Sequence, residues 1–119
     1  MGIILGIDVG GSTTKIVAYR NKKQMVGRLQ VRASDQLTSL YGAIGHFLHM
    51  HQLSLNDISR IVLTGVGTSY IKDNIYGIPT IKVDEFQAIG HGGAMLSQLD
   101  EALVVSMGTG SAYVQVKKD

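Results

Sequence analysis

The chain has 119 residues, of which 45% are hydrophobic and 17% are charged, and its formal net charge is +2. This length and composition predict a globular chain holding one domain, or one domain and part of another, and exclude a disordered one. The absence of cysteine excludes disulfides, thiolate metal sites and a cysteine nucleophile, and it fits the reducing cytoplasm, where we expect the protein.

Neither nucleic acid nor a membrane is expected as a partner. The basic residues are dispersed along the chain and only 6% of residues are aromatic, whereas a nucleic-acid surface needs clustered cations with stacking rings. No apolar run approaches the roughly 18 residues that a membrane-spanning helix needs.

The first half of the chain predicts three strands and a helix. Residues 3–8 form a short apolar run, typical of a strand buried on both faces. Gly10 and Gly11 connect it to a second β-rich run at 13–19, and a third strand is expected at 25–31. Apolar residues then recur at spacings of three and four over 37–51, which predicts a helix. Its N-cap is expected at Ser34 or Asp35.

The middle of the chain predicts strands alternating with helices. Residues 60–64, "RIVLT", form an apolar strand that ends at Gly65. A short helix is expected near residues 68–74, and Pro79 marks the loop before a strand at 80–83.

The last third predicts one helix and one hairpin. Asp84 is expected to cap a helix that runs to about residue 99. Strands at 102–107 and 112–117 flank a turn at 108–111. Four methionines are expected in or near the core as flexible filler: Met25, Met50, Met95 and Met107.

This order of elements predicts an α/β domain with a mixed sheet. Three meandering strands give antiparallel pairs, and the strands at 60–64 and 80–83 should then join in parallel. We expect residues 1–100 to form this first domain. An isolated hairpin is marginally stable, so residues 101–119 are interpreted as the first hairpin of a truncated second domain.

Two glycine turns share one composition: a strand, then glycine with serine or threonine, then a strand. Asp8 precedes Gly10 and Gly11, and the second turn covers residues 108–111. Glycine lets backbone N–H groups face an anion, hydroxyls add donors, and a carboxylate can hold hydrated Mg²⁺. Neither turn is a Walker loop or a G-x-G-x-x-G motif. Either turn alone could be an ordinary hairpin, but together with the acid they favour nucleotide phosphate.

Four segments carry a resemblance to known families. "GIDVGGSTTKIVAY" and "VVSMGTGSAYVQV" resemble the phosphate-1 and phosphate-2 motifs of the actin-like ATPase superfamily, which includes acetate and sugar kinases and actin. "VLTGVGTSYI" and "VDEFQAIGHGG" resemble the type II, eukaryotic-like pantothenate kinases. The resemblance runs from Gly6 to about Val116, with the motifs in the family's order. Gln87 departs from it, because the family usually has an acid there.

The resemblance implies an RNase H-like fold and transfer of the ATP γ-phosphoryl group to pantothenate, with ATP and Mg²⁺ as cofactors. It implies Glu85 as the base that accepts the hydroxyl proton, Lys15 as a positive charge beside the phosphates, and Asp8 as the holder of Mg²⁺. It implies phosphate contacts from two sets of residues: Gly10, Gly11, Ser12, Thr13 on one side, and Gly108, Thr109, Gly110, Ser111 on the other. We expect the two turns to face each other across a cleft, and the full-length protein to be a homodimer.

Three alternatives remain at this point. An activator ATPase of acyl-CoA dehydratases shares a similar start, but it uses cysteine-ligated iron–sulfur, and this chain has no cysteine. A sugar or N-acetylhexosamine kinase would place an Asp as base in a different local motif. A non-catalytic nucleotide-binding module would need no base. Because segments for adenine and pantothenate are missing, these 119 residues are expected to be inactive alone.

Overall fold

The structure, a computed structural model, describes residues 2–21, 24–97, 101–107 and 111–117. It divides into two compact units, Met1–Lys82 and Val83–Asp119. Within the described part of the chain, no helix is long and apolar enough to cross a bilayer.

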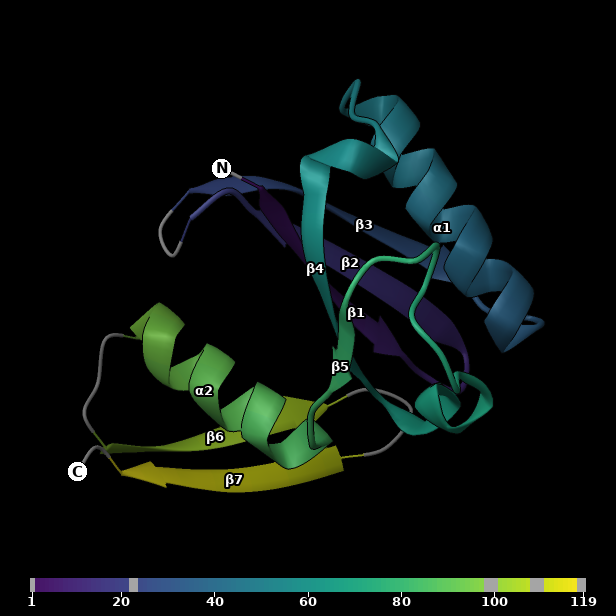
Figure 1. The fold of residues 1–119 in the computed structure, drawn as a ribbon. Helices are drawn as coiled ribbons and strands as arrows, with labels where there is room; N and C mark the ends of the chain where they lie inside the picture. The colour runs from purple at the N-terminus through teal and green to yellow at the C-terminus, as the bar shows by residue number, and fades with distance from the viewer. Residues whose placement is uncertain (1, 22–23, 98–100, 108–110, 118–119) are drawn as a thin grey trace. The chain divides into compact units, whose positions relative to one another are not determined.

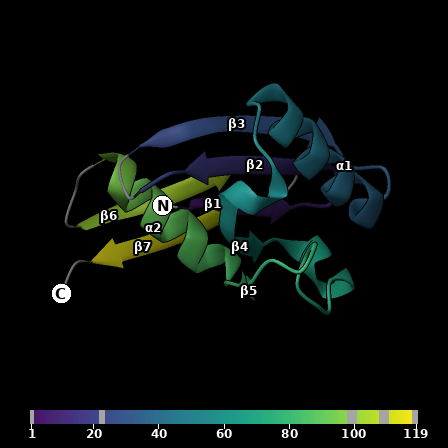
Figure 2. The same cartoon turned by 45° about the horizontal axis from the view of Figure 1, so that its top comes forward.

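Unit 1 is built on a five-stranded sheet in the order β3-β2-β1-β4-β5 (Figures 1 and 2). Its strands are β1 (Ile3–Val9), β2 (Thr13–Tyr19), β3 (Met25–Arg32), β4 (Ile58–Thr64) and β5 (Thr80–Lys82). The β1–β2 and β2–β3 pairs are antiparallel, whereas β4 pairs with β1 in parallel and β5 pairs with β4 in parallel. The predicted mixed sheet is therefore confirmed.

Helix α1 (Gln36–Met50) packs on one face of this sheet (Figure 1). Asp35 caps it, as one of the two expected residues, because its Oδ2 accepts a 2.8 Å hydrogen bond from the Thr38 N–H. The core lies between α1 and the sheet, and alternate strand residues point into it. Its members are Ile3, Leu5, Ile7, Val9, Ile16, Ala18, Leu40, Ala43, Ile44, Phe47, Leu48, Ile58, Ile61 and Leu63, together with Ile71, Ile75 and Ile78 from the loop before β5.

Two expectations for unit 1 are corrected. The helix expected near residues 68–74 is a short 3₁₀ segment, η2 (Val66–Tyr70), which ends where Ile71 turns extended and enters the core. Met25 and Met50 are about half exposed, at 48% and 50%, because each lies at the outer end of its element. A further 3₁₀ turn, η1 (Leu55–Asp57), leads into β4.

Unit 2 contains helix α2 (Glu85–Ser97) and a hairpin of β6 (Glu101–Met107) and β7 (Ser111–Lys117). The two strands pair antiparallel, and α2 contacts both of them. Asp84 caps α2 as expected, because its Oδ2 accepts a 3.1 Å hydrogen bond from the Gln87 N–H. The helix thus groups with the hairpin, whereas the domain boundary between residues 100 and 101 stays a prediction.

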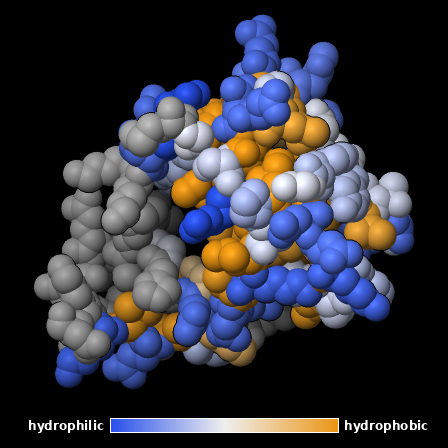
Figure 3. Space-filling view, viewed as in Figure 1, coloured by the Kyte–Doolittle hydropathy of each residue, from blue (hydrophilic) through white to orange (hydrophobic). Residues whose placement is uncertain are grey.

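Apolar surface is interspersed with hydrophilic side chains on the face of the molecule shown in Figure 3. Two of the most exposed large apolar side chains, Val66 and Tyr70, belong to η2, at 66% and 63% exposure. The segment that follows β4 is therefore on the surface, next to the end of the sheet where the predicted site begins.

Candidate phosphate and metal site

Asp8 lies near the carboxyl end of β1, between β2 and β4. It alternates with the buried residues Ile7 and Val9, so its side chain lies on the sheet face opposite α1. Its register partners are Lys15 on β2 and Thr64 on β4. Partners opposite each other share a face. One carboxylate, one ammonium group and one hydroxyl are therefore gathered at this point of the sheet.

The electrostatics of Asp8 fit a cation site. Burial raises the pKa of the Asp8 carboxyl above its ordinary value, and the positive charge of Lys15 offsets part of that rise. The half-buried carboxylate is thus costly to ionise in the ligand-free protein. A cation placed beside it would remove that cost.

The fit for Mg²⁺ can be judged from the donors present. Among the described residues, no three His, Cys, Asp or Glu side chains come together as a metal cage. Mg²⁺ usually keeps several waters and takes one or two carboxylates together with substrate phosphates. Asp8 with phosphate nearby fits that mode. The buried Thr64 Oγ1, which has no hydrogen-bond partner among the described residues, offers an acceptor for one of the waters.

The turn after β1 is held in place from the side of α1. Gln36 Nε2 donates a 3.1 Å hydrogen bond to the Gly10 carbonyl, and the Ala33 N–H donates one of 3.0 Å to the Ser12 carbonyl. Inside the turn, the Gly10 N–H donates to the Thr13 carbonyl at 2.9 Å. The predicted phosphate turn therefore has a fixed backbone.

Gly10 and Gly11 differ in the space that the fold leaves for a side chain. A Cβ on Gly10 would lie 2.9 Å from the Thr13 carbonyl oxygen, so a side chain there would require a shift. A Cβ on Gly11 would meet nothing within 4 Å, and neither glycine has a positive φ. Nothing in the described structure requires glycine at position 11. Its missing side chain instead leaves open space at the turn that follows β1.

A third glycine turn, not assigned any role from the sequence, follows β4. Gly65 has φ 101° and ψ 165°, and a Cβ there would lie 2.5 Å from the Val9 carbonyl oxygen and 2.6 Å from Asp8 Oδ1. A Cβ on Gly67 would collide with the Val9 side chain. Thr68 closes the turn through its N–H and Oγ1, which donate to the Gly65 carbonyl at 3.2 and 2.9 Å. The turn therefore packs directly against the Asp8 carboxylate.

The sequence did hold a signal for this turn. The strands at 3–8 and 60–64 were expected to be parallel, and the carboxyl ends of parallel strands meet at one edge. The residues after both strands, Gly10 and Gly65, could therefore have been placed together.

The remaining predicted residues stay predictions. Glu85 is the first residue of α2 and is exposed. Ser111 begins β7. Gly108, Thr109 and Gly110 lie outside the described residues, and so does the expected meeting of the two glycine turns across a cleft.

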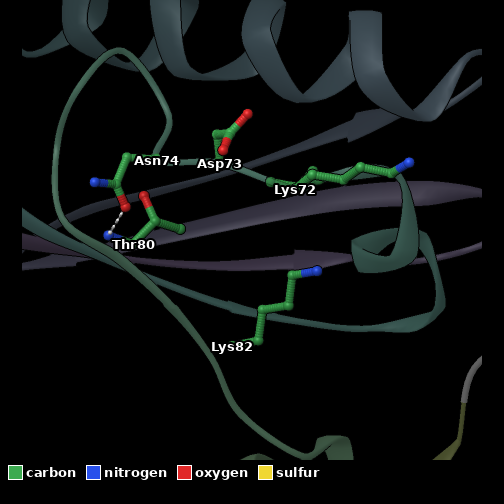
Figure 4. Close-up of a pocket in the computed structure, with 6 residues that line it drawn as sticks. Lys72, Asp73, Asn74, Thr80 and Lys82 are labelled. Atoms are coloured by element: carbon green, nitrogen blue, oxygen red, sulfur yellow. Dashed lines mark hydrogen bonds between the residues drawn. The ribbon is translucent and has the colours of Figure 1, made fainter.

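A separate cavity of about 250 Å³ lies along the loop before β5 (Figure 4). It is lined by Ile71, Lys72, Asp73, Asn74, Thr80 and Lys82. Asn74 Oδ1 accepts from the Thr80 N–H at 3.1 Å, and Thr80 Oγ1 donates to the Ile78 carbonyl at 2.8 Å. The polar groups of Asn74 and Thr80 are thus used in closing the loop. No predicted site residue lines the cavity.

No protein-family model and no curated protein matches the sequence. Solved structures do resemble it. Component A of (R)-2-hydroxyglutaryl-CoA dehydratase from Acidaminococcus fermentans aligns with a TM-score of 0.73 and 18% identity, over 96% of this chain and 43% of that one. The activator of 2-hydroxyisocaproyl-CoA dehydratase from Clostridium difficile, with bound ADPNP, aligns with a TM-score of 0.71 and 15% identity, over 95% and 46%.

A candidate N-acetylmannosamine kinase from Listeria monocytogenes aligns with a TM-score of 0.64 and 15% identity, over 98% of this chain and 47% of that one. The chain therefore spans less than half the length of each of these three structures. At such identities the likeness shows the fold. The chain has the fold of the actin-like ATPases, as its two phosphate motifs predicted.

Proposed function

We propose that this chain is the amino-terminal, nucleotide-binding part of an ATP-dependent kinase, and that the full-length protein phosphorylates pantothenate to 4'-phosphopantothenate. That reaction is the first step of coenzyme A biosynthesis. The observation that carries the nucleotide part is the pair of Gly11 and Asp8. Gly11 provides a position without a side chain that the fold itself does not need. Asp8 provides a half-buried carboxylate, made costly by burial, at the same edge of the sheet.

The residues at this edge of the sheet have different roles in binding ATP. The backbone of Gly10 to Thr13, fixed by Gln36 and Ala33, faces the β- and γ-phosphates. Lys15 adds positive charge, and Asp8 holds the hydrated Mg²⁺, which neutralises charge on the phosphates when bound. The resemblance also assigns phosphate contacts to Gly108, Thr109, Gly110 and Ser111.

Glu85 acts on the acceptor. Phosphoryl transfer is catalysed mainly by positioning and charge, with a base near the attacking hydroxyl. The hydroxyl oxygen forms a bond to the γ-phosphorus, the bond from that phosphorus to the ADP oxygen breaks, and the hydroxyl proton passes to Glu85. Asp84 is the residue that caps α2. The Glu85 carboxylate is therefore not needed as a cap and is available as the base.

The choice of pantothenate is supported by the sequence of α2 and of the two residues that precede it. "VDEFQAIGHGG" resembles the base-bearing segment of type II pantothenate kinases. The fold itself is shared with proteins named for other substrates, including an N-acetylmannosamine kinase candidate and dehydratase activators. The acceptor therefore has to be identified by assay.

The test is ADP release by the full-length protein, measured with a coupled assay in parallel reactions. One contains pantothenate, one N-acetylmannosamine, one N-acetylglucosamine, and one no acceptor. We expect ADP release that depends on pantothenate. Turnover with an amino sugar would contradict the acceptor, and equal ADP release without any acceptor would favour an ATPase instead of a kinase.

A further inference from the structure

The hydroxyl of Thr64 is buried and has no hydrogen-bond partner among the described residues. Such groups are rare in folded proteins, since a buried donor and acceptor left unpaired is costly. A valine has the same shape without that cost, and strands favour valine. The position of the hydroxyl therefore calls for a physical reason.

Its place in the sheet suggests one. Thr64 is the last residue of β4 and the register partner of Asp8 on the parallel strand β1. Residues 62 and 64 alternate with the buried Ile61 and Leu63, so Thr64 shares with Asp8 the face opposite α1. The next residue, Gly65, packs against Asp8 Oδ1. The unpaired hydroxyl and the half-buried carboxylate thus belong to one edge.

We propose that Thr64 is a positioning residue for the cation of the nucleotide complex. Its hydroxyl oxygen accepts a hydrogen bond from a water of the hydrated Mg²⁺ that Asp8 holds. This rests on the proposed function, in which Asp8 faces Mg·ATP. Water bound to a divalent cation is a strong donor, and outer-shell partners of this kind fix where a metal sits. Pairing the hydroxyl in this way accounts for a threonine where valine would fit.

The chain offers a matched control in Thr14. Its Oγ1 is also buried without a hydrogen-bond partner in the described part of the chain, but the residue is fully buried and lies on the face of the sheet that α1 covers. Its register partner is Val9 and not a charged residue. Replacing either threonine with valine removes one unpaired hydroxyl, but only Thr64 lies on the side of Asp8.

The experiment compares full-length wild type, Thr64→Val, Thr64→Ser and Thr14→Val by thermal shift. Mg²⁺ is titrated at saturating ATP, and the Mg²⁺ concentration that gives half of the stabilisation is measured. Thr64→Val should raise this concentration by about tenfold, as outer-shell changes at metal sites do. Thr64→Ser, which keeps the hydroxyl, and Thr14→Val should stay within about twofold of wild type. Without ligand, Thr64→Val should melt no lower than wild type, because a methyl group replaces an unpaired hydroxyl.

The outcomes separate the two proposals. If wild type shows a Mg²⁺-dependent ATP shift and Thr64→Val has the same Mg²⁺ midpoint, the role of Thr64 is wrong while the nucleotide site stands. If wild type shows no Mg²⁺-dependent shift at all, the proposed function fails and the inference falls with it. A loss shared equally by Thr14→Val would also overturn the inference, because it would reflect removal of any buried hydroxyl.

Discussion

Replacing Gly65 with alanine tests whether the turn after β4 is built as the structure shows. Gly65 has φ 101° and ψ 165°, a region that residues other than glycine rarely enter, at a cost of roughly 1–3 kcal/mol. The new Cβ would also lie 2.5 Å from the Val9 carbonyl oxygen and 2.8 Å from the Val9 carbonyl carbon. These are backbone atoms at the end of β1, so the clash cannot be relieved by turning a side chain.

The size of the effect follows from these two terms. Overpacking of this kind costs roughly 1–3 kcal/mol. Together with the backbone term it should lower the free energy of unfolding by roughly 2–6 kcal/mol. With a urea m-value of about 2 kcal/mol per M, the unfolding midpoint falls by about 1–3 M.

The assay is urea unfolding of the full-length protein, with Gly11→Ala as the matched control. Gly11 has no neighbour within 4 Å of a Cβ and no positive φ. Gly11→Ala should therefore leave the free energy of unfolding unchanged or raise it by about 0.4–1 kcal/mol, through the unfolded chain. If Gly65→Ala unfolds within about 0.5 kcal/mol of wild type, a range ordinary for surface changes, the described contact with Val9 is wrong.

Three further predictions concern ligands and pH. Gly11→Val should abolish the thermal shift with Mg·ATP while barely moving the ligand-free midpoint; a ligand-free protein that unfolds would show instead that the turn needs this glycine. Because burial raises the folded-state pKa of Asp8, the folded state holds that proton more tightly than the unfolded state. The contribution of Asp8 to stability is then fully present below its unfolded pKa and is lost as pH rises through the folded pKa. Asp8→Asn should therefore unfold at higher urea than wild type at pH 7 without ligand, yet show no Mg·ATP shift, and an Asn variant with an intact shift would contradict the metal role. Glu85→Gln should lower kcat with pantothenate by about 10²–10⁴-fold, as loss of a general base does, while the affinity for ATP is kept. Asp84→Ala should lower the free energy of unfolding by about 1 kcal/mol as a lost cap and keep most of the activity. The reverse pattern would show that Asp84, and not Glu85, is the base.

Much of the fold was predictable because it depends on short-range patterns. The change of period after residue 36 and the acidic caps at Asp35 and Asp84 each report a local preference, and each is confirmed. Residues 3–8 do form a strand, but the expectation that it is buried on both faces is wrong, because Ile4 is 42% exposed and only the alternate residues point into the core. The parallel joining of β4 and β5 followed from connection rules. These rules need no knowledge of which side chains meet across the molecule.

What the sequence did not reveal depends on contacts between distant residues. Gly65 is forced by Val9 and Asp8, which are more than fifty positions away in the chain. The length of η2 is set by Ile71, which leaves the helix to enter the core. The grouping of α2 with the hairpin likewise depends on contacts between elements, because α2 contacts both β6 and β7. A residue pattern states that a face is apolar, but not what packs on it.

The glycines at positions 11 and 65, which follow β1 and β4 at one edge of the sheet, have opposite physical causes, and this contrast makes the candidate site testable. Gly65 is required by the fold, because its backbone conformation and its contacts with β1 both exclude a side chain. At Gly11, neither the backbone conformation nor a close contact excludes a side chain. A site that had evolved only as a hairpin would not need the second glycine, and a phosphate group would need it for close approach to the backbone. Since Asp8 lies between the two turns, a substitution at Gly65 should weaken ligand binding indirectly, by lowering the stability of the fold and displacing the Asp8 carboxylate. A substitution at Gly11 should weaken ligand binding without changing stability.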